Sequence, residues 1–226
     1  MRRKILGVSG VHKMDIKISE IFTSIDGEVN YWGQGKLTTF IRLYGCNLQC
    51  LYCDTKYSWH GSFIQMPVRE IVEKITANKV TITGGEPLLQ YKAVSELIGK
   101  IYKTKKISLE TNGTIGFVWL KNTYPDISIV MDIKEHYWSQ YNWHELVKNI
   151  SCMDAKDYVK IVFQDKEKAL CIIRDIQHLN KDINIALSVV DGHKNYNYRE
   201  LIDFLLDKKI TEVSINVQLH KLIGER

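Results

Sequence analysis

The sequence lacks several features that would place it in common classes of protein. Its aliphatic residues occur only in short runs, whereas a membrane-spanning helix needs about 18 consecutive apolar residues. No apolar segment follows the basic residues at positions 1–6, so we expect no secretory signal, no membrane association and a cytoplasmic protein. The net charge is +5, but the Lys and Arg residues are dispersed. Without a basic stripe that carries stacking aromatic residues, no nucleic-acid partner is expected.

A disulfide framework and a dinucleotide-binding fingerprint are also missing. The five cysteines are an odd number, and three of them, Cys46, Cys50 and Cys53, fall close together. This pattern in a cytosolic chain indicates metal or redox chemistry rather than disulfide bonds. Cys152 and Cys171 stand alone and are expected to be buried, inert thiols. No Gly-x-Gly-x-x-Gly segment is present, which disfavours a doubly wound nucleotide-binding sheet.

The length of 226 residues suits one α/β domain. No internal repeat, low-complexity tract or linker divides the chain. We expect a single domain over residues 15–226. Residues 1–14 are interpreted as an N-terminal extension, or as residues around an alternative start at Met14.

Short β-branched or aromatic segments alternate with amphipathic helical segments along the chain. Strands are predicted at 36–43, 79–83, 107–110, 127–132, 158–163, 183–189 and 213–217. Helices are predicted from Pro67 to about Ile75 and over 89–102, 166–179 and 198–208. The connection from 110 to 127 is too short for a long crossover helix. The pattern predicts a partial, open TIM-like barrel of about six parallel strands, with a reduced helix set and an N-terminal strand extension.

The cysteine cluster directly follows the first predicted barrel strand, at the edge of the sheet where barrel enzymes place their chemistry. Cys46, Cys50 and Cys53 can each ligate one iron of a 4Fe–4S cube. The fourth iron then has no protein ligand and can bind a substrate or cofactor. Structural zinc is the competing interpretation, with His60 as the nearest fourth ligand, but no second Cys-x-x-Cys pair exists.

The Cys-x-x-x-Cys-x-x-Cys spacing, together with Gly-Gly-Glu-Pro at 84–87, resembles the radical S-adenosylmethionine superfamily. Further segments at 20–28, 40–42, 53–55, 110–114 and 217–221 resemble the 7-carboxy-7-deazaguanine synthases of queuosine and deazapurine biosynthesis. The resemblance implies a carbon–nitrogen lyase that converts 6-carboxy-5,6,7,8-tetrahydropterin to 7-carboxy-7-deazaguanine with loss of ammonia. It also implies a 4Fe–4S cluster, S-adenosylmethionine that is regenerated, and Mg²⁺.

The resemblance also implies roles for individual residues. The cofactor is expected to contact Tyr52, Cys53, Asp54, Gly85, Glu110, Asp132, Ile133, Lys134 and Gln164. The substrate is expected to contact Ile25, Asp26, Gly27, Glu28, Arg42, Thr83 and His220, and Thr55 is expected to ligate Mg²⁺. Among these, Arg42 is counted with the three cysteines as catalytic, because a guanidinium can clamp the substrate carboxylate.

Two segments depart from the family pattern, which usually has Gln in place of Asp26, often Gly in place of Val29, and often Ser-Pro in place of Asp132-Ile133. By the same resemblance we expect a homodimer and a flavodoxin- or ferredoxin-type reductant. Two alternatives stay open at this point. One is a glycyl-radical activating enzyme that acts on a protein partner, and the other is a non-enzymatic, zinc-stabilised binding module.

Overall fold

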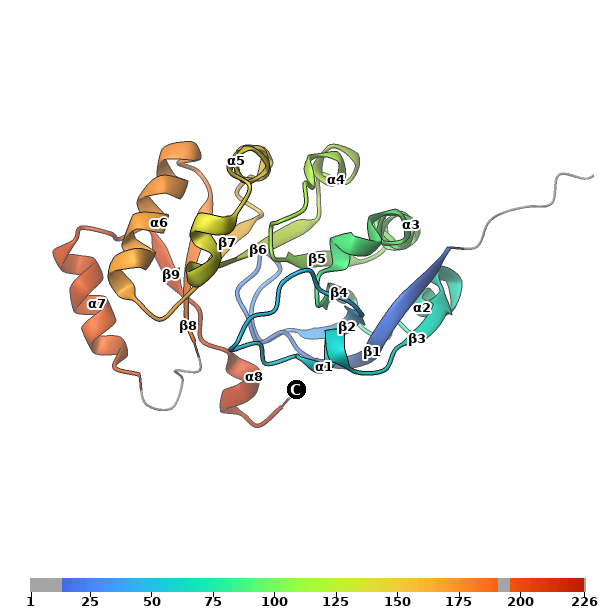
Figure 1. Cartoon of the computed structure of the whole chain (residues 1–226). Coiled ribbons are helices and arrows are strands. Elements are labelled where there is room, and N and C mark those ends of the chain that lie inside the picture. The colour runs from blue at the N-terminus through green and yellow to red at the C-terminus, as the bar shows by residue number, and fades with distance from the viewer. Residues whose placement is uncertain (1–13, 191–195, 226) are drawn as a thin grey trace, which may run out of the picture.

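The computed structural model describes residues 14–190 and 196–225, which form a curved sheet with helices along its outer side (Figure 1). Within these residues the sheet has nine strands in the order β3-β1-β2-β4-β5-β6-β7-β8-β9. The strands are β1 (Asp15–Ile25), β2 (Leu37–Leu43), β3 (Ile64–Pro67), β4 (Lys79–Gly84), β5 (Lys106–Thr111), β6 (Ser128–Lys134), β7 (Tyr158–Phe163), β8 (Asn184–Val189) and β9 (Val213–Ile215). No helix in the described ranges is both long and apolar enough to cross a membrane.

The strands β2 and β4 to β9 pair in parallel. The strands β1 and β3 extend the sheet beside β2 and pair in antiparallel fashion. The sheet stays open, with β3 and β9 at its two ends in the described part of the chain. The predicted α/β open barrel with an N-terminal strand extension is therefore confirmed, with seven parallel strands where about six were expected.

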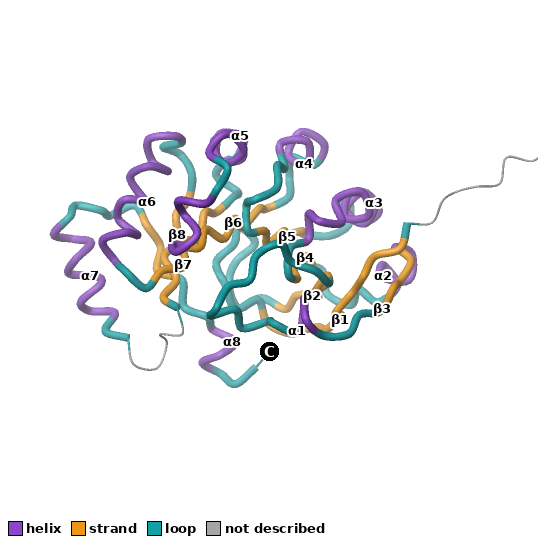
Figure 2. The backbone as a smooth tube through the Cα atoms, viewed as in Figure 1, coloured by secondary structure: helices purple, strands orange, loops and turns teal. Residues whose placement is uncertain are grey.

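The helices are α1 (Tyr57–His60), α2 (Val68–Glu73), α3 (Tyr91–Ile101), α4 (Val118–Thr123), α5 (Trp143–Cys152), α6 (Lys166–Leu179), α7 (Tyr198–Asp207) and α8 (Leu219–Leu222). Two 3₁₀ turns, η1 (Pro87–Gln90) and η2 (Glu135–Gln140), follow β4 and β6. In Figures 1 and 2, α3 to α7 follow the outer side of the sheet, whereas α8 lies apart from them near the C-terminus.

Strand periodicity separates an apolar outer face from a polar inner face. On β6, Ile129, Met131 and Ile133 point into the hydrophobic core beneath the helices. The alternate residues Asp132 and Lys134 point to the inner face and line a cavity there. The other parallel strands repeat this arrangement, so the polar side chains of the sheet converge on its inner side.

Several predictions from the sequence differ from the structure. The strand β3 and the helices α1 and α5 were not predicted, whereas the short connection after β5 does hold only the six-residue helix α4, as expected. The helix predicted at 89–102 is divided into η1 and α3, and the helix after Pro67 ends at Glu73. Cys171 is exposed on α6 and Cys152 is half-buried, so the expectation of two buried thiols was wrong. The interpretation of residues 1–13 lies outside the described residues.

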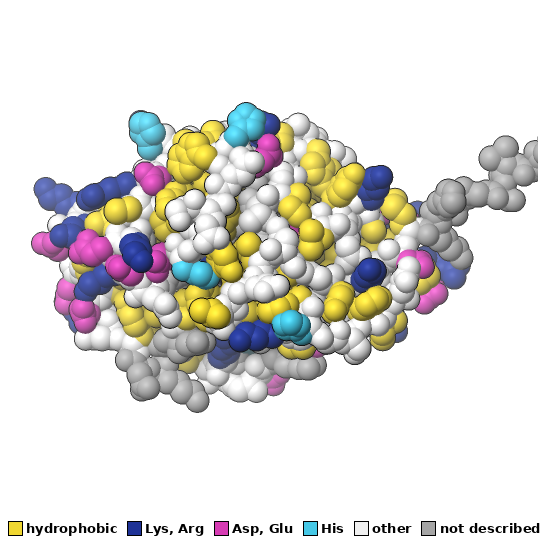
Figure 3. All heavy atoms as spheres, in the orientation of Figure 1, with side chains coloured by type: hydrophobic (Ala, Val, Ile, Leu, Met, Phe, Trp, Pro, Cys, Tyr) yellow, Lys and Arg dark blue, Asp and Glu magenta, His cyan; other side chains and the backbone are white. Residues whose placement is uncertain are grey.

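On the face seen in Figure 3, Lys and Arg are mixed with Asp and Glu over the end formed by α6 and α7. They do not gather into a single basic stripe on this face. The dispersed charge expected from the sequence is therefore visible on this side of the molecule.

Candidate active site

A cavity of about 380 Å³ lies on the inner side of the sheet. Its wall is formed by the cysteine loop, by the inner-face residues of the parallel strands and by the C-terminal segment. Most of the site residues expected from the sequence lie on this wall, although they come from elements far apart in the chain. They are Glu28, Arg42, Cys46, Cys50, Tyr52, Cys53, Asp54, Thr55, Thr83, Gly85, Glu110, Asp132, Lys134 and His220.

The cysteine loop runs from the end of β2 to α1 and places three free thiols on the cavity wall. Burial raises the pKa of the Cys46 and Cys50 thiols, and the charges of neighbouring cysteines act in the same direction. Thiols gathered in this way favour a cationic centre that stabilises their thiolate forms. Three such donors on one loop would suit a 4Fe–4S cluster, which they would hold at the cavity wall.

The Gly-Gly-Glu-Pro segment, which begins with the last residue of β4, packs directly against this loop. A β-carbon on Gly85 would lie 2.6 Å from the carbonyl carbon of Gly45 and 2.7 Å from Cys46 Cβ. Both distances are shorter than ordinary contacts, so only glycine allows the two backbones to come this close. Gly84 has a φ of +151°, and a β-carbon there would meet the backbone of Leu43.

Glu86 fixes the ends of two strands from beneath the site. Its buried carboxylate accepts hydrogen bonds from the Leu88 amide (2.9 Å), the Thr111 hydroxyl (2.8 Å) and the Asn112 amide (2.7 Å). Burial raises the pKa of Glu86 to about 7, although these donors act in the opposite direction. The contacts join the turn after β4 to the end of β5, and both segments border the cavity.

Arg42 projects from β2 into the cavity and is held in a fixed position. Its Nε donates to Glu20 Oε1 at 2.8 Å, and Tyr57 donates its hydroxyl to the same oxygen at 2.6 Å. The guanidinium carbon lies 5.9 Å from the ring centres of both Tyr57 and Phe22. A planar guanidinium held in this way is suited to bidentate recognition of a carboxylate.

Glu110, Asp132 and Lys134 provide charge at the ends of β5 and β6. Burial raises the pKa of Glu110 to about 7, and the charges of Asp26 and Asp132 act in the same direction. Lys134 Nζ lies 2.9 Å from Asp132 Oδ2. Although burial lowers the pKa of Lys134, the Asp132 carboxylate outweighs it, so the net shift is upward and the ammonium form is retained.

The C-terminal segment closes one side of the cavity. Gln218 donates to Glu28 Oε1 at 2.6 Å, and Lys221 Nζ lies 2.8 Å from Asp54 Oδ2. Although burial raises the pKa of Asp54, the contact with Lys221 outweighs it and lowers that pKa overall. His220 packs so closely on Gly27 that a β-carbon there would lie 2.7 Å from the imidazole Cγ.

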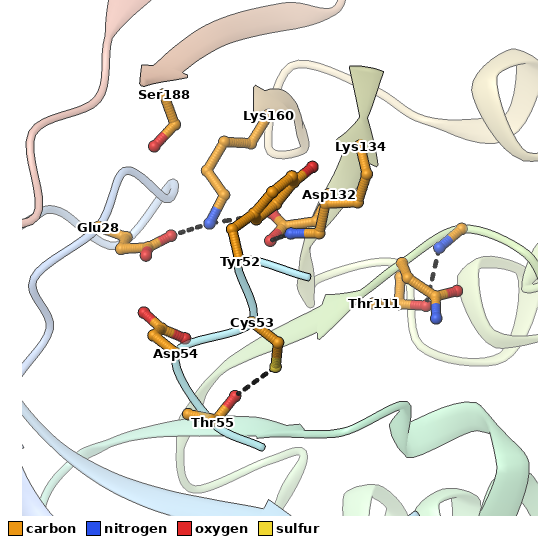
Figure 4. A network of polar contacts seen from close by, with 12 residues as sticks. Glu28, Tyr52, Cys53, Asp54, Thr55, Thr111, Asp132, Lys134, Lys160 and Ser188 are labelled. Carbon is orange, nitrogen blue, oxygen red and sulfur yellow. Dashed lines mark hydrogen bonds and ion pairs between the residues drawn. The ribbon is translucent and has the colours of Figure 1, made fainter. Parts of the chain in front are cut away.

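Tyr52 and Thr55 flank the last cysteine (Figure 4). The Tyr52 hydroxyl shares a hydrogen bond of 2.7 Å with Nδ1 of His136, which holds the ring at the cavity wall. Thr55 Oγ1 lies 3.6 Å from Cys53 Sγ. The threonine hydroxyl is therefore beside the cysteine loop, on the same wall as Arg42 and Asp54.

Five expected site residues do not lie on the cavity wall: Ile25, Asp26, Gly27, Ile133 and Gln164. The buried carboxylate of Asp26 forms an ion pair with Lys79 and accepts a hydrogen bond of 3.0 Å from Thr81. Ile133 points into the hydrophobic core, because it alternates with Asp132 and Lys134. Gln164 is exposed after β7. Direct side-chain contacts of these residues with a ligand stay predictions.

Other cavity residues were not identified from the sequence. Lys160 is a single cation in the otherwise apolar or aromatic strand β7, and this interruption was an available signal. Asn112 follows the β5 strand within a segment that was noted only for its resemblance. Gln218 and Lys221 likewise lie in the segment 217–221, which was noted only for its resemblance, and the fold brings them to the cavity.

Comparison with known proteins agrees with this site. Residues 40–122, which hold the cysteine loop and the Gly-Gly-Glu-Pro segment, match the family model described as the radical SAM superfamily. The open parallel sheet and the three-cysteine loop thus define a radical S-adenosylmethionine enzyme. A 7-carboxy-7-deazaguanine synthase of Clostridium acetobutylicum is 36% identical over 93% of this chain and 96% of its own length. Another, from Methanospirillum hungatei, is 38% identical over 92% of this chain and 86% of its own. The chain belongs to the 7-carboxy-7-deazaguanine synthase family.

Solved structures support the fold independently. QueE from Escherichia coli superposes with a TM-score of 0.70 at 21% identity, over 92% of this chain and 95% of that one. Streptococcus suis SuiB bound to its precursor peptide SuiA gives a TM-score of 0.57 at 15% identity, over 81% of this chain and 49% of that one. Membership of the radical SAM superfamily implies a 4Fe–4S cluster and S-adenosylmethionine.

Proposed function

We propose that this protein converts 6-carboxy-5,6,7,8-tetrahydropterin to 7-carboxy-7-deazaguanine, with loss of ammonia. The observation that carries the proposal is the agreement between the family and the cavity. Relatives named 7-carboxy-7-deazaguanine synthase match over more than nine-tenths of the chain. In addition, a fixed arginine and the cysteine loop lie on one wall of the cavity. The site thus offers a cationic group for a carboxylate beside the place of radical chemistry.

Cys46, Cys50 and Cys53 would hold the cluster, which when bound supplies the electron that cleaves S-adenosylmethionine. For the cofactor itself we propose contacts with Tyr52, Asp54, Gly85, Glu110, Asp132 and Lys134. Ile133 and Gln164 would contact it through backbone atoms or after a local movement of the chain. The charged members of this set suit the ammonium, carboxylate and ribose groups of the cofactor. The close packing of Gly85 on Cys46 fixes the cysteine loop against that side of the cavity.

Arg42 would bind the substrate carboxylate, with Glu20 and Tyr57 holding the guanidinium in place. Glu28, Thr83 and His220 would contact the remainder of the pterin from other parts of the wall. Ile25, Asp26 and Gly27 would act from behind this wall. In particular, the Asp26–Lys79 ion pair beneath the loop supports the segment that presents Glu28.

We propose that Thr55 contributes a hydroxyl ligand to Mg²⁺. A hard cation of this kind binds oxygen ligands and keeps several waters. In the described residues no group of three Asp and Glu side chains is arranged to hold a metal ion. The remaining Mg²⁺ ligands would therefore come from the substrate and from water.

The broader setting is also proposed from the family resemblance. A flavodoxin- or ferredoxin-type protein would supply electrons, and two copies of the chain would form a homodimer. A cytoplasmic location stays a prediction. The single domain over 15–226 is likewise the simplest division of the chain, because one continuous sheet runs from β1 to β9.

Anaerobic turnover with the carboxypterin, S-adenosylmethionine and dithionite tests the proposal, with the product identified by mass spectrometry. We expect 7-carboxy-7-deazaguanine from the wild-type protein and none from Arg42→Ala at the same substrate concentration. Arg42→Lys keeps the charge but loses the planar fork, so we expect an intermediate loss. A brown, cluster-containing protein that forms no deazapurine would argue against the synthase and for an activating enzyme.

A further inference from the structure

Four side chains of alternating charge form a row across the cavity. Glu28 forms an ion pair with Lys160, whose Nζ also lies 3.0 Å from Asp132 Oδ1. Asp132 in turn binds Lys134 through its other oxygen at 2.9 Å. Figure 4 shows Lys160 reaching from β7 to a point between Glu28 and Asp132. All four residues line the cavity.

The fold fixes the members of this row relative to one another. Lys160 and Asp132 are direct neighbours on the parallel strands β7 and β6. Glu28 lies in the loop between β1 and β2, and Gln218 of the C-terminal segment donates to its second oxygen at 2.6 Å. Lys160 is therefore the group that joins this loop to β6.

Lys160 is also well shielded from solvent, with only 5% of its side chain exposed. Burial lowers the pKa of Lys160 to about 7, whereas the two carboxylates in contact with its nitrogen favour the ammonium. Without this cation, the half-buried carboxylates of Glu28 and Asp132 would lose the ammonium that lies between them. Removing one partner of such a buried set is costly for the charges that remain.

We propose that Lys160 is a positioning residue that holds Glu28, on the pterin side of the cavity, in a fixed relation to Asp132, on the cofactor side. This inference rests on the proposed function, because it concerns how two ligands are placed together. Gln218 and Lys160 together determine the direction in which the Glu28 carboxylate points.

The test uses Lys160→Met, which keeps the apolar stem and removes the ammonium. We expect the dissociation constant of the carboxypterin for the cluster-free protein, measured by anaerobic equilibrium dialysis, to rise on the order of tenfold. In the loaded enzyme we expect more 5′-deoxyadenosine released per deazapurine formed, because a misplaced substrate is used less efficiently. Lys160→Arg should restore most of the affinity.

The matched control is Lys121→Met. Lys121 is also 5% exposed and also lies between two carboxylates, of Asp154 and Asp157, but it is outside the cavity wall. This variant should lose stability and keep the wild-type dissociation constant and product ratio. In a Glu28→Gln background, Lys160→Met should cause a smaller loss of affinity than in wild type, because Lys160 acts through Glu28.

The inference is overturned if Lys160→Met binds the carboxypterin as wild type does, or if Lys121→Met shifts binding equally. It is also overturned if the two substitutions at positions 28 and 160 act independently. Should Lys160→Met fail to fold, Lys160→Arg carries the test, and it should then retain most of the wild-type affinity and product ratio. Failure of the proposed function is a separate result, in which the wild-type protein itself forms no deazapurine.

Discussion

Gly85→Ala perturbs the site at the contact that fixes the cysteine loop. The added methyl group would lie 2.6 Å from the Gly45 carbonyl carbon and 2.7 Å from Cys46 Cβ. Non-bonded carbon atoms prefer separations of about 3.5–4.0 Å, so the loop must move by roughly 1 Å. Both contacts are with backbone or with the first side-chain atom, and neither can rotate away.

Two magnitudes follow from that displacement. Overpacking of this kind costs about 1–3 kcal/mol, which lowers the melting temperature of a domain of this size by about 2–12 °C. A shift of roughly 1 Å in a positioned reactive group can lower the rate about 100-fold. We therefore expect Gly85→Ala to fold, to melt earlier and to lose far more activity than stability.

The assay compares melting of the cluster-free protein, iron content after anaerobic reconstitution, and turnover. Gly116→Ala is the control, because its methyl group would meet only the end of the flexible Glu145 side chain, at 2.7 Å from Oε2. It should resemble wild type in all three measurements. Wild-type iron content and turnover in Gly85→Ala would refute the argument that close packing at this glycine fixes the cluster loop.

Three further predictions concern the cluster, the metal and pH. Cys50→Ala should hold less iron after reconstitution and lose turnover, whereas Cys171→Ala, at an exposed position outside the cavity, should behave as wild type. Thr55→Ala should raise the Mg²⁺ concentration for half-maximal turnover on the order of tenfold, whereas Thr55→Ser should not. Identical Mg²⁺ titrations of wild type and Thr55→Ala would contradict the assignment of Thr55 as a Mg²⁺ ligand. Burial raises the pKa of Glu86 from 4.5 to about 7, so the unfolded chain ionises first and the free energy of unfolding falls as the pH rises between these values. Urea unfolding should show this decline in wild type and a smaller one in Glu86→Gln.

The parallel strands could be predicted closely from sequence because each is a short β-branched segment bounded by turn residues. The strand at 158–163 was predicted with the boundaries that β7 has in the structure. By contrast, β3 has only four residues and exists because it pairs with the distant β1. The helix α5 was missed because it turns only two apolar side chains, Leu146 and Ile150, into the core.

In the candidate site, too, local sequence patterns could be predicted, whereas contacts between distant segments could not. The cysteine spacing and the Gly-Gly-Glu-Pro segment are local patterns, and both lie at the cavity as expected. The partner of Asp26, however, is Lys79, which lies 53 positions away in the sequence, and no local pattern indicates that this aspartate is buried in an ion pair. The position of Lys160 between Glu28 and Asp132 also depends on the pairing of β6 with β7.

The most direct test of the account is the ratio of product to cofactor in anaerobic turnover. The wild-type protein is supplied with excess carboxypterin and a limiting amount of S-adenosylmethionine, and both 7-carboxy-7-deazaguanine and 5′-deoxyadenosine are quantified. We predict deazapurine in several-fold excess over the S-adenosylmethionine supplied, and none from Cys50→Ala. Cleavage of S-adenosylmethionine by the wild-type protein without any 7-carboxy-7-deazaguanine would contradict the proposed function.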